Sequence, residues 1–251
     1  ARRQLPVLRR QAENIPDGLW LHTLVRYPFL AALPLPAQQR LRSLCAQFLT
    51  DKEFHGANGL EITDEIALAI AAQACLPVLR LGLQAFDGFV GIVVHSDEVQ
   101  VKREVMDEDG LVHEYDDVLS GEAMEGGPVM LSWRDVHDAG ESAAWGYNVV
   151  IHEFAHVLDM GDGLADGIPP LSSTAEREHW LAVLMDEYEA FCDRVEHGKD
   201  TVLDPYGADS PEEFFAVASE SFFVAPLDMR GEHSALYALL AGYYRQDPAG
   251  E

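Results

Sequence analysis

The stretch VVIHEFAHVLDM, from Val149 to Met160, decides the fold, because it sets three polar side chains into an apolar helical run. His152, Glu153 and His156 form an HExxH motif. At about 3.6 residues per turn, the two histidines lie about 40° apart on one helix face, separated by roughly 6 Å of rise. Two neutral imidazoles at that separation bind one metal ion, and zinc suits them best. Glu153 lies further round the helix, in the position of a general base in a zinc hydrolase.

The apolar residues around the motif indicate that its helix is buried. Valine, isoleucine, leucine, alanine and phenylalanine fill the other positions from 149 to 158. Burying two histidines and a glutamate without partners would cost several kcal/mol, which favours a metal ion as the compensating group. The alternative is a core helix that binds no metal and whose histidines hydrogen-bond to the backbone.

The composition is that of an acidic globular protein. Its 251 residues suit one domain with a substantial core, and 48% of them are hydrophobic. The formal net charge of -26 argues against nucleic acid and anionic membranes as direct partners, because both attract clustered lysine and arginine. A charged surface also keeps a protein soluble without binding any ligand.

Cysteine usage predicts a reducing compartment. Cys45, Cys75 and Cys192 are widely spaced and odd in number, so no disulfide framework is expected. The apolar stretch over residues 19–35 is interrupted by an arginine and two prolines, which is typical of neither a signal peptide nor a membrane span. We therefore expect a cytoplasmic protein.

Hydrophobic periodicity predicts an α+β fold that is mainly helical, with a small mixed β-sheet and the HExxH motif on a buried helix. Helices are expected over residues 36–54, 63–81, 147–161, 174–196, 210–224 and 234–245, and strands over 90–94, 99–106, 111–119 and 129–133. Thr63 is expected to cap the second helix and Pro77 to kink or end it. Asp107 to Gly110 is expected to form a hairpin turn.

The order of these elements predicts one domain. We expect an N-terminal leader over residues 1–35 and a single domain over residues 36–248. Its parts are a helical scaffold (36–87), a sheet region (88–133) and the metal-site helices (145–248). The strand at 129–133 lies close in sequence to the motif and is expected to border the cleft, where such strands pair with extended peptides.

A catalytic zinc needs a third protein ligand, and the residues leave several candidates open. The metzincin pattern would place glycine and histidine at positions 159 and 162, but both are aspartates, so that family is excluded. Asp159 shares the face of the two histidines, where contact with a histidine is favoured over ligation. Glu213 and Glu220 share one face of a later helix, and spacing favours neither. Glu213 also fits a capping box that begins at Ser210.

Five motifs resemble the Mlc titration factor A (MtfA) family of zinc-dependent peptidases. They are QACLPVLRLGL, SGEAMEGGPVMLSW, the VIHEFAHVLDM helix, the DPY turn and SPEEFFAVASESFF, followed by YYRQDP near the end. The resemblance covers residues 41–248 and keeps the order of the motifs. The arginine-rich leader has no clear counterpart in it.

The resemblance implies a set of site residues. Both motif histidines and the glutamate that opens the later helix, here Glu213, would hold one zinc ion per chain. Glu220 would then contact a ligand or support the structure. Tyr206, in the turn before this helix, matches an active-site tyrosine that could donate to the oxyanion of a tetrahedral intermediate. An aromatic that merely packs against the turn is the alternative for Tyr206.

The resemblance also implies an aminopeptidase-like activity on short peptides and, in enteric bacteria, binding to the glucose-responsive repressor Mlc. We expect a zinc metallopeptidase with Glu153 as general base. The rival hypothesis is a regulatory protein that sequesters a transcriptional repressor and has little or no physiological proteolysis. Its acidic surface would meet a basic DNA-binding domain.

Overall fold

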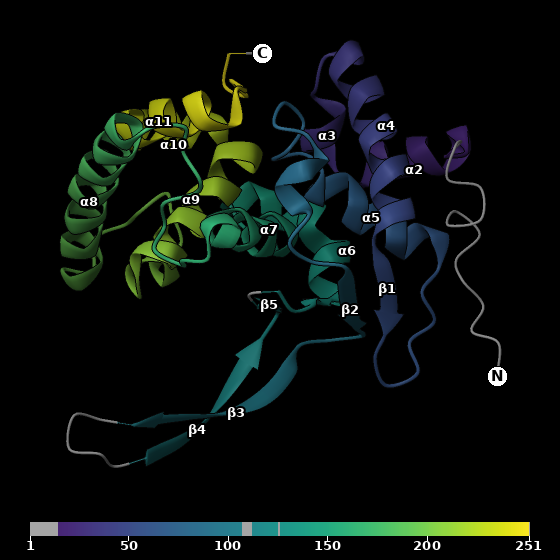
Figure 1. Ribbon diagram of the computed structural model, residues 1–251, viewed down its shortest axis with the longest axis horizontal. Helices are drawn as coiled ribbons and strands as arrows, with labels where there is room; N and C mark the ends of the chain where they lie inside the picture. Colours follow the sequence, from purple (N-terminus) through teal and green to yellow (C-terminus); the bar gives the residue numbers. More distant parts are fainter. Residues whose placement is uncertain (1–14, 107–111, 125, 251) are drawn as a thin grey trace.

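Helices make up most of the molecule and enclose the helix that carries the HExxH motif (Figure 1). The computed structural model describes residues 15–106, 112–124 and 126–250. The expected hairpin turn at Asp107 to Gly110 and the first fourteen residues of the expected leader lie outside this part of the chain. Mostly helical, with a small mixed sheet, the chain has the expected α+β character.

The helices follow the predicted order, with shorter elements between them. They are α2 (Asp17–Arg26), α3 (Pro28–Ala31), α4 (Leu35–Asp51), α5 (Asp64–Ala74), α6 (Trp133–Ser142), α7 (Val149–Asp159), α8 (Thr174–Glu196), α9 (Pro211–Val224), α10 (Pro226–Glu232) and α11 (Ser234–Tyr244), with 3-10 helices η1 (Leu83–Phe86), η2 (Ala143–Trp145), η3 (Met160–Asp162) and η4 (Pro205–Ala208). The oxygen of Thr63 accepts from the backbone N–H of Ile66, as an N-cap does. α5 ends at Ala74 instead of Leu81, because Pro77 lacks the N–H that would continue it.

The four-stranded sheet is mixed, and its edge lies beside α7. Its strands are β1 (Glu53–Gly56), β2 (Gly91–His95), β6 (Val129–Ser132) and β5 (Gly121–Ala123), in the order β1-β2-β6-β5. β1, β2 and β6 are parallel, whereas β5 is antiparallel to β6. The strand expected to border the cleft is β6, but β6 lies between β2 and β5. The edge strand against α7 is β5, so that expectation was wrong.

A long hairpin joins β2 to β5. Its strands, β3 (Val99–Met106) and β4 (Val112–Leu119), form a separate antiparallel sheet with Val99 opposite Leu119. The hairpin projects from the helical body (Figure 1). β4 leads through Ser120 directly into β5, so the hairpin is rooted beside the cleft-facing edge of the mixed sheet.

α7 crosses the centre of the molecule between α5, α9 and the sheet (Figure 1). Phe154 packs its ring against Phe48, Phe86 and Phe89, with centroids 5.0 to 5.8 Å apart. Burying one such side chain stabilises the fold by about 1.5–3 kcal/mol. This aromatic contact fixes one face of α7, and its polar face is thereby turned toward α9.

Part of the segment expected as a leader is helical. Trp20 of α2, Leu30 of α3 and Tyr27 between the two helices are buried in the common core, and the phenol of Tyr27 donates to the carbonyl of Val136 in α6. These contacts join residues 15–35 to the rest of the fold. In the described part of the chain, no helix combines the length and the apolar composition that crossing a membrane requires.

Candidate metal centre

The N-terminus of α7 is held by a buried polar network around Asn148. The side-chain oxygen of Asn148 accepts from the N–H of Ile151 at 2.9 Å and caps the helix. Its side-chain nitrogen donates to the amide oxygen of Gln73 at 2.8 Å, and its backbone N–H donates to the carboxylate of Glu220. α7 is therefore tied to α5 and α9 at the end that carries the first histidine.

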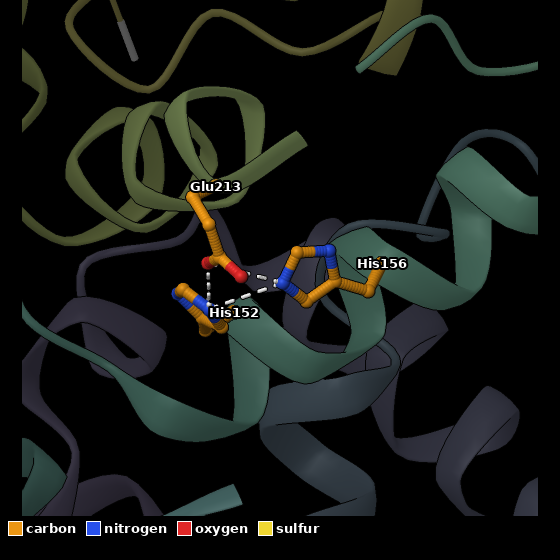
Figure 2. A group of neighbouring side chains, drawn as sticks. All are labelled: His152, His156 and Glu213. Atoms are coloured by element: carbon orange, nitrogen blue, oxygen red, sulfur yellow. Dashed lines mark hydrogen bonds and ion pairs between the residues drawn. The ribbon is translucent and has the colours of Figure 1, made fainter. Parts of the chain in front are cut away.

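His152 and His156 turn their rings toward the same point, as their spacing predicts (Figure 2). The ring centroids are 4.8 Å apart, and the two Nε2 atoms are 3.2 Å apart. His152 is buried and His156 is partly buried. Because each side chain leaves from the same face of one helix, this pair requires no unusual backbone geometry.

Glu213 reaches the same point from the first turn of α9 (Figure 2). Its Oε2 lies 3.1 Å from Nε2 of His152 and 3.4 Å from Nε2 of His156. Oε2 is buried and makes no geometrically sound hydrogen bond despite these short distances. Ser210 caps α9 by accepting from the N–H of Glu213 at 3.3 Å, so half of the predicted capping box is formed while the carboxylate faces the histidines.

The three atoms fit a zinc ion. Zinc ligands at about 2.0–2.2 Å in a tetrahedral arrangement lie about 3.3–3.6 Å from one another. The three observed separations span 3.1 to 3.4 Å. Two imidazoles and one carboxylate also form a donor set that suits zinc. His152, His156 and Glu213 thus have the spacing, the chemistry and an unpartnered buried oxygen that a cation would satisfy.

Glu220 occupies the opposite edge of the His152 ring. Its Oε1 accepts from Nδ1 of His152 at 2.8 Å, and its Oε2 accepts from the N–H of Asn148. In the neutral imidazole this bond keeps the proton on Nδ1, which leaves the lone pair of Nε2, on the side of Glu213 and His156, for a metal ion. Burial alone would lower the pKa of His152, but the nearby carboxylates of Glu213 and Glu220 outweigh it and raise the pKa well above its usual value. Burial raises the pKa of Glu220.

Glu153 is buried beside the cluster without joining it. Burial raises the pKa of its carboxyl to about 7, although the charges of His152 and His156 act in the opposite direction. Gly121 of β5 lies close to this carboxyl. A Cβ atom at that position would lie 2.4 Å from Oε1 of Glu153, so the backbone of β5 approaches the carboxylate more closely than any larger residue permits.

Tyr206 lies at the mouth of the site, in η4. The carboxylate of Asp204 accepts from the N–H of Tyr206 at 2.9 Å and holds this turn. The ring centroids of Tyr206 and His152 are 6.0 Å apart, and the side chain of Tyr206 is 49% exposed. Burial and the charge of Glu213 raise the pKa of its phenol, which therefore stays protonated and able to donate near neutral pH.

Asp159, the other candidate for the third ligand, lies outside the cluster. It is fully buried, and its Oδ2 accepts from the N–H of Gly167 at 2.9 Å. Burial raises the pKa of its carboxyl to about 6. This bond therefore holds the loop after α7, and no bond from Asp159 to a histidine is formed in the described residues.

Sequence reasoning missed two residues that shape the site. Gly121 belongs to a three-residue strand that has no periodicity to detect. Asn148 did carry a signal, because an asparagine directly before an apolar helical run is a preferred N-cap. Neither residue contributes an atom to the cluster, but Gly121 lies close to Glu153, and Asn148 caps the helix that carries the two histidines.

Comparison with known families covers almost the whole chain. A family described as glucose-regulated metallo-peptidase M90 matches residues 1–245. The match begins at the first residue, so the leader, for which no clear counterpart was expected, is part of the matched region. The family is one of metallopeptidases, which implies a metal ion of the kind that the cluster fits.

Individual relatives agree with the family match. An uncharacterized protein of Synechocystis is 39% identical over 89% of this chain and 82% of its own length. Proteins named Mlc titration factor A in Yersinia pestis and Yersinia pseudotuberculosis are 38% identical over 90% of this chain and 84% of their own length. The chain therefore belongs to the Mlc titration factor A family of glucose-regulated metallo-peptidases, M90.

Proposed function

We propose that this chain is a zincin-like, aminopeptidase-like zinc peptidase that binds one zinc ion per chain through His152, His156 and Glu213. The observation that carries the proposal is the convergence of two Nε2 atoms and one buried carboxylate oxygen within 3.4 Å of one another. When bound, zinc supplies Lewis acidity: it lowers the pKa of a coordinated water to about 7 and polarises the carbonyl group under attack.

Glu153 is the proposed general base. Burial holds its pKa at about 7, so the carboxyl accepts and releases a proton near neutral pH. It would take the proton of the attacking water and pass it to the nitrogen of the leaving amine. Glu153 is not a member of the ligand cluster, which supports this assignment, since a carboxylate bound to the metal would be a poorer base.

Tyr206 is the proposed donor to the oxyanion. Its phenol remains protonated and partly exposed at the mouth of the site, next to Glu213. A hydrogen bond to the negative oxygen of the tetrahedral intermediate would stabilise the transition state more than the substrate. The role carried over from the family resemblance thus agrees with the chemistry of this side chain.

The edge of β5 that faces away from β6 is the proposed binding element for the peptide backbone. Among the described strands β5 pairs with β6, and it lies against α7 beside Glu153. An extended peptide that adds to this edge would lie alongside the catalytic base, because edge strands offer unpaired backbone donors and acceptors.

The test is metal-dependent cleavage of matched peptides. Purified protein is assayed on short peptides with free N-termini and on the same peptides with acetylated N-termini. We expect cleavage that a chelator abolishes and that added zinc restores, with acetylation reducing the rate if the activity is that of an aminopeptidase. Cleavage that persists in the zinc-free protein would contradict the proposal.

A second candidate function is supported by the names of the relatives and by charge. The Yersinia relatives are named for titration of Mlc, and this chain has a formal net charge of -26. An acidic surface complements a basic DNA-binding protein. We propose that a transcriptional repressor of this kind is an alternative partner. Capture of such a repressor by zinc-free protein and by the Glu153→Gln variant would favour sequestration, whereas capture that requires zinc would favour the enzyme.

The cysteines support a cytoplasmic location for either function. Cys45, Cys75 and Cys192 are all unpaired in the structure, and two of them are buried in the core. Free thiols are typical of reducing compartments.

A further inference from the structure

A cavity of about 600 Å³ lies at the C-terminal end of α7, outside the metal cluster. Phe89, Val157, Leu158 and Tyr243 contribute apolar surface to its walls, and Phe89 and Leu158 are almost fully buried. A volume of this order is typical of pockets that bind ligands, which span about 300–1,000 Å³. None of the residues assigned to zinc binding or proton transfer lines it.

The cavity adjoins the C-terminal end of α7, the helix that carries the two histidines of the proposed metal site. Val157 lines the cavity and follows the ligand His156 directly. It is also one helical turn beyond Glu153, so the two side chains share a face. The base and the cavity wall are therefore separated by about 6 Å along the helix.

β5 leads from the base to the same cavity. Gly121, at the start of β5, contacts Glu153, and Met124, just past its end, lines the cavity together with Val157. Three strand residues extend about 10 Å. A peptide that runs alongside β5 and is cleaved beside Glu153 would thus have a residue at the cavity within three positions of the cleaved bond.

The lining favours an apolar occupant. More of the lining surface is apolar than polar, and the polar lining residues Gln84, Asp87 and Arg245 are exposed. Asp87 and Arg245 have opposite charges, so the lining does not select one sign of charge. A large aliphatic or aromatic side chain would leave water and contact Phe89, Val157 and Leu158. Removing apolar surface from water in this way lowers the free energy.

We propose that this α7–β5 cavity is a specificity pocket that binds a large apolar side chain of the peptide substrate, one to three residues from the cleaved bond. The inference rests on the proposed peptidase function and adds to it a class of substrate. Peptides that carry phenylalanine or leucine at one position near the cut would be preferred over those with alanine or a charged residue.

The experiment begins with a peptide library whose products are identified by mass spectrometry. Enrichment of large apolar residues is expected at a single position within three residues of the cut. Two peptides that differ only by phenylalanine or alanine there are then compared. We expect kcat/KM to be about 10-fold or more higher for the phenylalanine peptide. No apolar enrichment at any position would overturn the inference while leaving the peptidase function intact.

Variants that fill the cavity complete the test. Ala85→Trp fills it from η1 and Met124→Trp fills it from the end of β5, and each is checked for folding by thermal unfolding. We expect both to reduce the preference for phenylalanine to less than about threefold, because the phenylalanine side chain no longer fits the cavity. Leu181→Trp, on exposed α8 surface, is the matched control and should keep the preference. A preference that survives in both filled variants would refute the assignment.

A binding measurement separates failure of the pocket from failure of the enzyme. Both peptides are titrated into zinc-loaded Glu153→Gln protein by calorimetry. We expect at least about 10-fold tighter binding of the phenylalanine peptide, and loss of that difference in the Met124→Trp background. Absence of hydrolysis by the wild type, combined with this binding preference, would overturn the peptidase function alone. Equal binding of the two peptides would overturn the pocket.

Discussion

The first and third turns of α9 each bring a glutamate to His152, but to opposite edges of its ring. Glu213 faces Nε2 with an unpartnered oxygen, while Glu220 accepts from Nδ1 and from the N–H of Asn148. Burial acts to raise the pKa of both carboxyls. In Glu213 the imidazoles of His152 and His156 outweigh burial and lower the pKa, whereas in Glu220 burial prevails and the pKa stays raised.

Two glutamates on one face of α9 thus differ in role because they have different partners. Glu220 bonds to partners within the protein and fixes the proton of His152 on Nδ1. One carboxylate oxygen of Glu213 faces Nε2 of both histidines, and this group of three atoms could hold a cation. On the proposed assignment, Glu213 would bind the metal at one edge of the His152 ring, and Glu220 would orient that ring from the other edge.

Glu153→Gln sharpens the comparison with a third buried glutamate and should have the largest effect on turnover. The amide keeps the size of the side chain but cannot accept a proton from water. We expect kcat/KM to fall by about 10²–10⁴-fold with zinc content unchanged. Steady-state kinetics and elemental analysis of the same preparation check this, and near-normal activity in the variant would refute the assigned role.

Tyr206→Phe tests whether the residue next to Glu213 acts on the substrate or merely packs. Loss of the phenol hydroxyl should lower kcat by about 10- to 100-fold, with little change in KM, because the donor acts on the oxyanion. Tyr237→Phe is the matched control, since its hydroxyl donates to Asp247 away from the site. A rise in KM alone would identify Tyr206 as a residue for substrate binding.

Glu220→Gln tests the orienting half of the comparison. An amide oxygen accepts only part of what the carboxylate accepts, so the orientation of His152 and the N-terminus of α7 are both weakened. We expect zinc affinity to fall by about 10- to 100-fold while some metal-dependent activity is retained at saturating zinc. Competition with a chelating dye measures the affinity, and Glu212→Gln on the same helix is the control. Unchanged affinity would show that Glu220 only supports the fold.

Gly121→Ala should have the smallest effect on activity. The substitution would displace Glu153, the proposed base, and not Glu213 or Glu220. The added Cβ would lie 2.4 Å from Oε1 of Glu153, so β5 or the carboxylate must move. We expect a loss of about tenfold in kcat with zinc retained. Gly242→Ala, where no atom lies within 4 Å of the added Cβ, is the matched control. Equal activity in both variants would contradict the close contact.

Local signals in the sequence predict the long helices better than the short elements. The helix at Thr174–Glu196 has the predicted bounds because its Ser173 cap and its aromatic spacing are both local features of the sequence. Trp20, Tyr27 and Leu30 also follow helical spacing, but the prolines around them concealed two short helices. β5 has only three residues and was not predicted, since its strand character comes from pairing with β6.

The formation of α6 depends more on tertiary contacts than on its local sequence. Ser132 caps this helix by accepting from the N–H of Asp135, yet its polar sequence and Gly140 make it a weak helix by propensity. A Cβ at Gly140 would lie 1.9 Å from the carbonyl oxygen of Arg26. The glycine is therefore needed for the close approach of α6 to α2, which no local pattern reveals.

In the candidate site, too, some positions follow from local spacing and others only from the packing of helices. The spacing of His152 and His156 predicts their shared face, because both lie on one helix. Glu213 and Glu220 are seven residues apart on α9, so spacing treats them alike, and only the distance between α7 and α9 separates them. Resemblance to a family favoured Glu213 as ligand, and that assignment stays a prediction until a metal is measured.

Zinc content per chain in four proteins tests the central claim most directly. Wild type, His156→Ala, Glu213→Ala and Glu220→Gln are purified in parallel, saturated with zinc, dialysed and examined by elemental analysis. We predict about one zinc per chain in wild type and in Glu220→Gln, and loss of zinc in His156→Ala and Glu213→Ala. Full zinc content in Glu213→Ala, or none in a saturated wild type, would contradict the proposed metal centre.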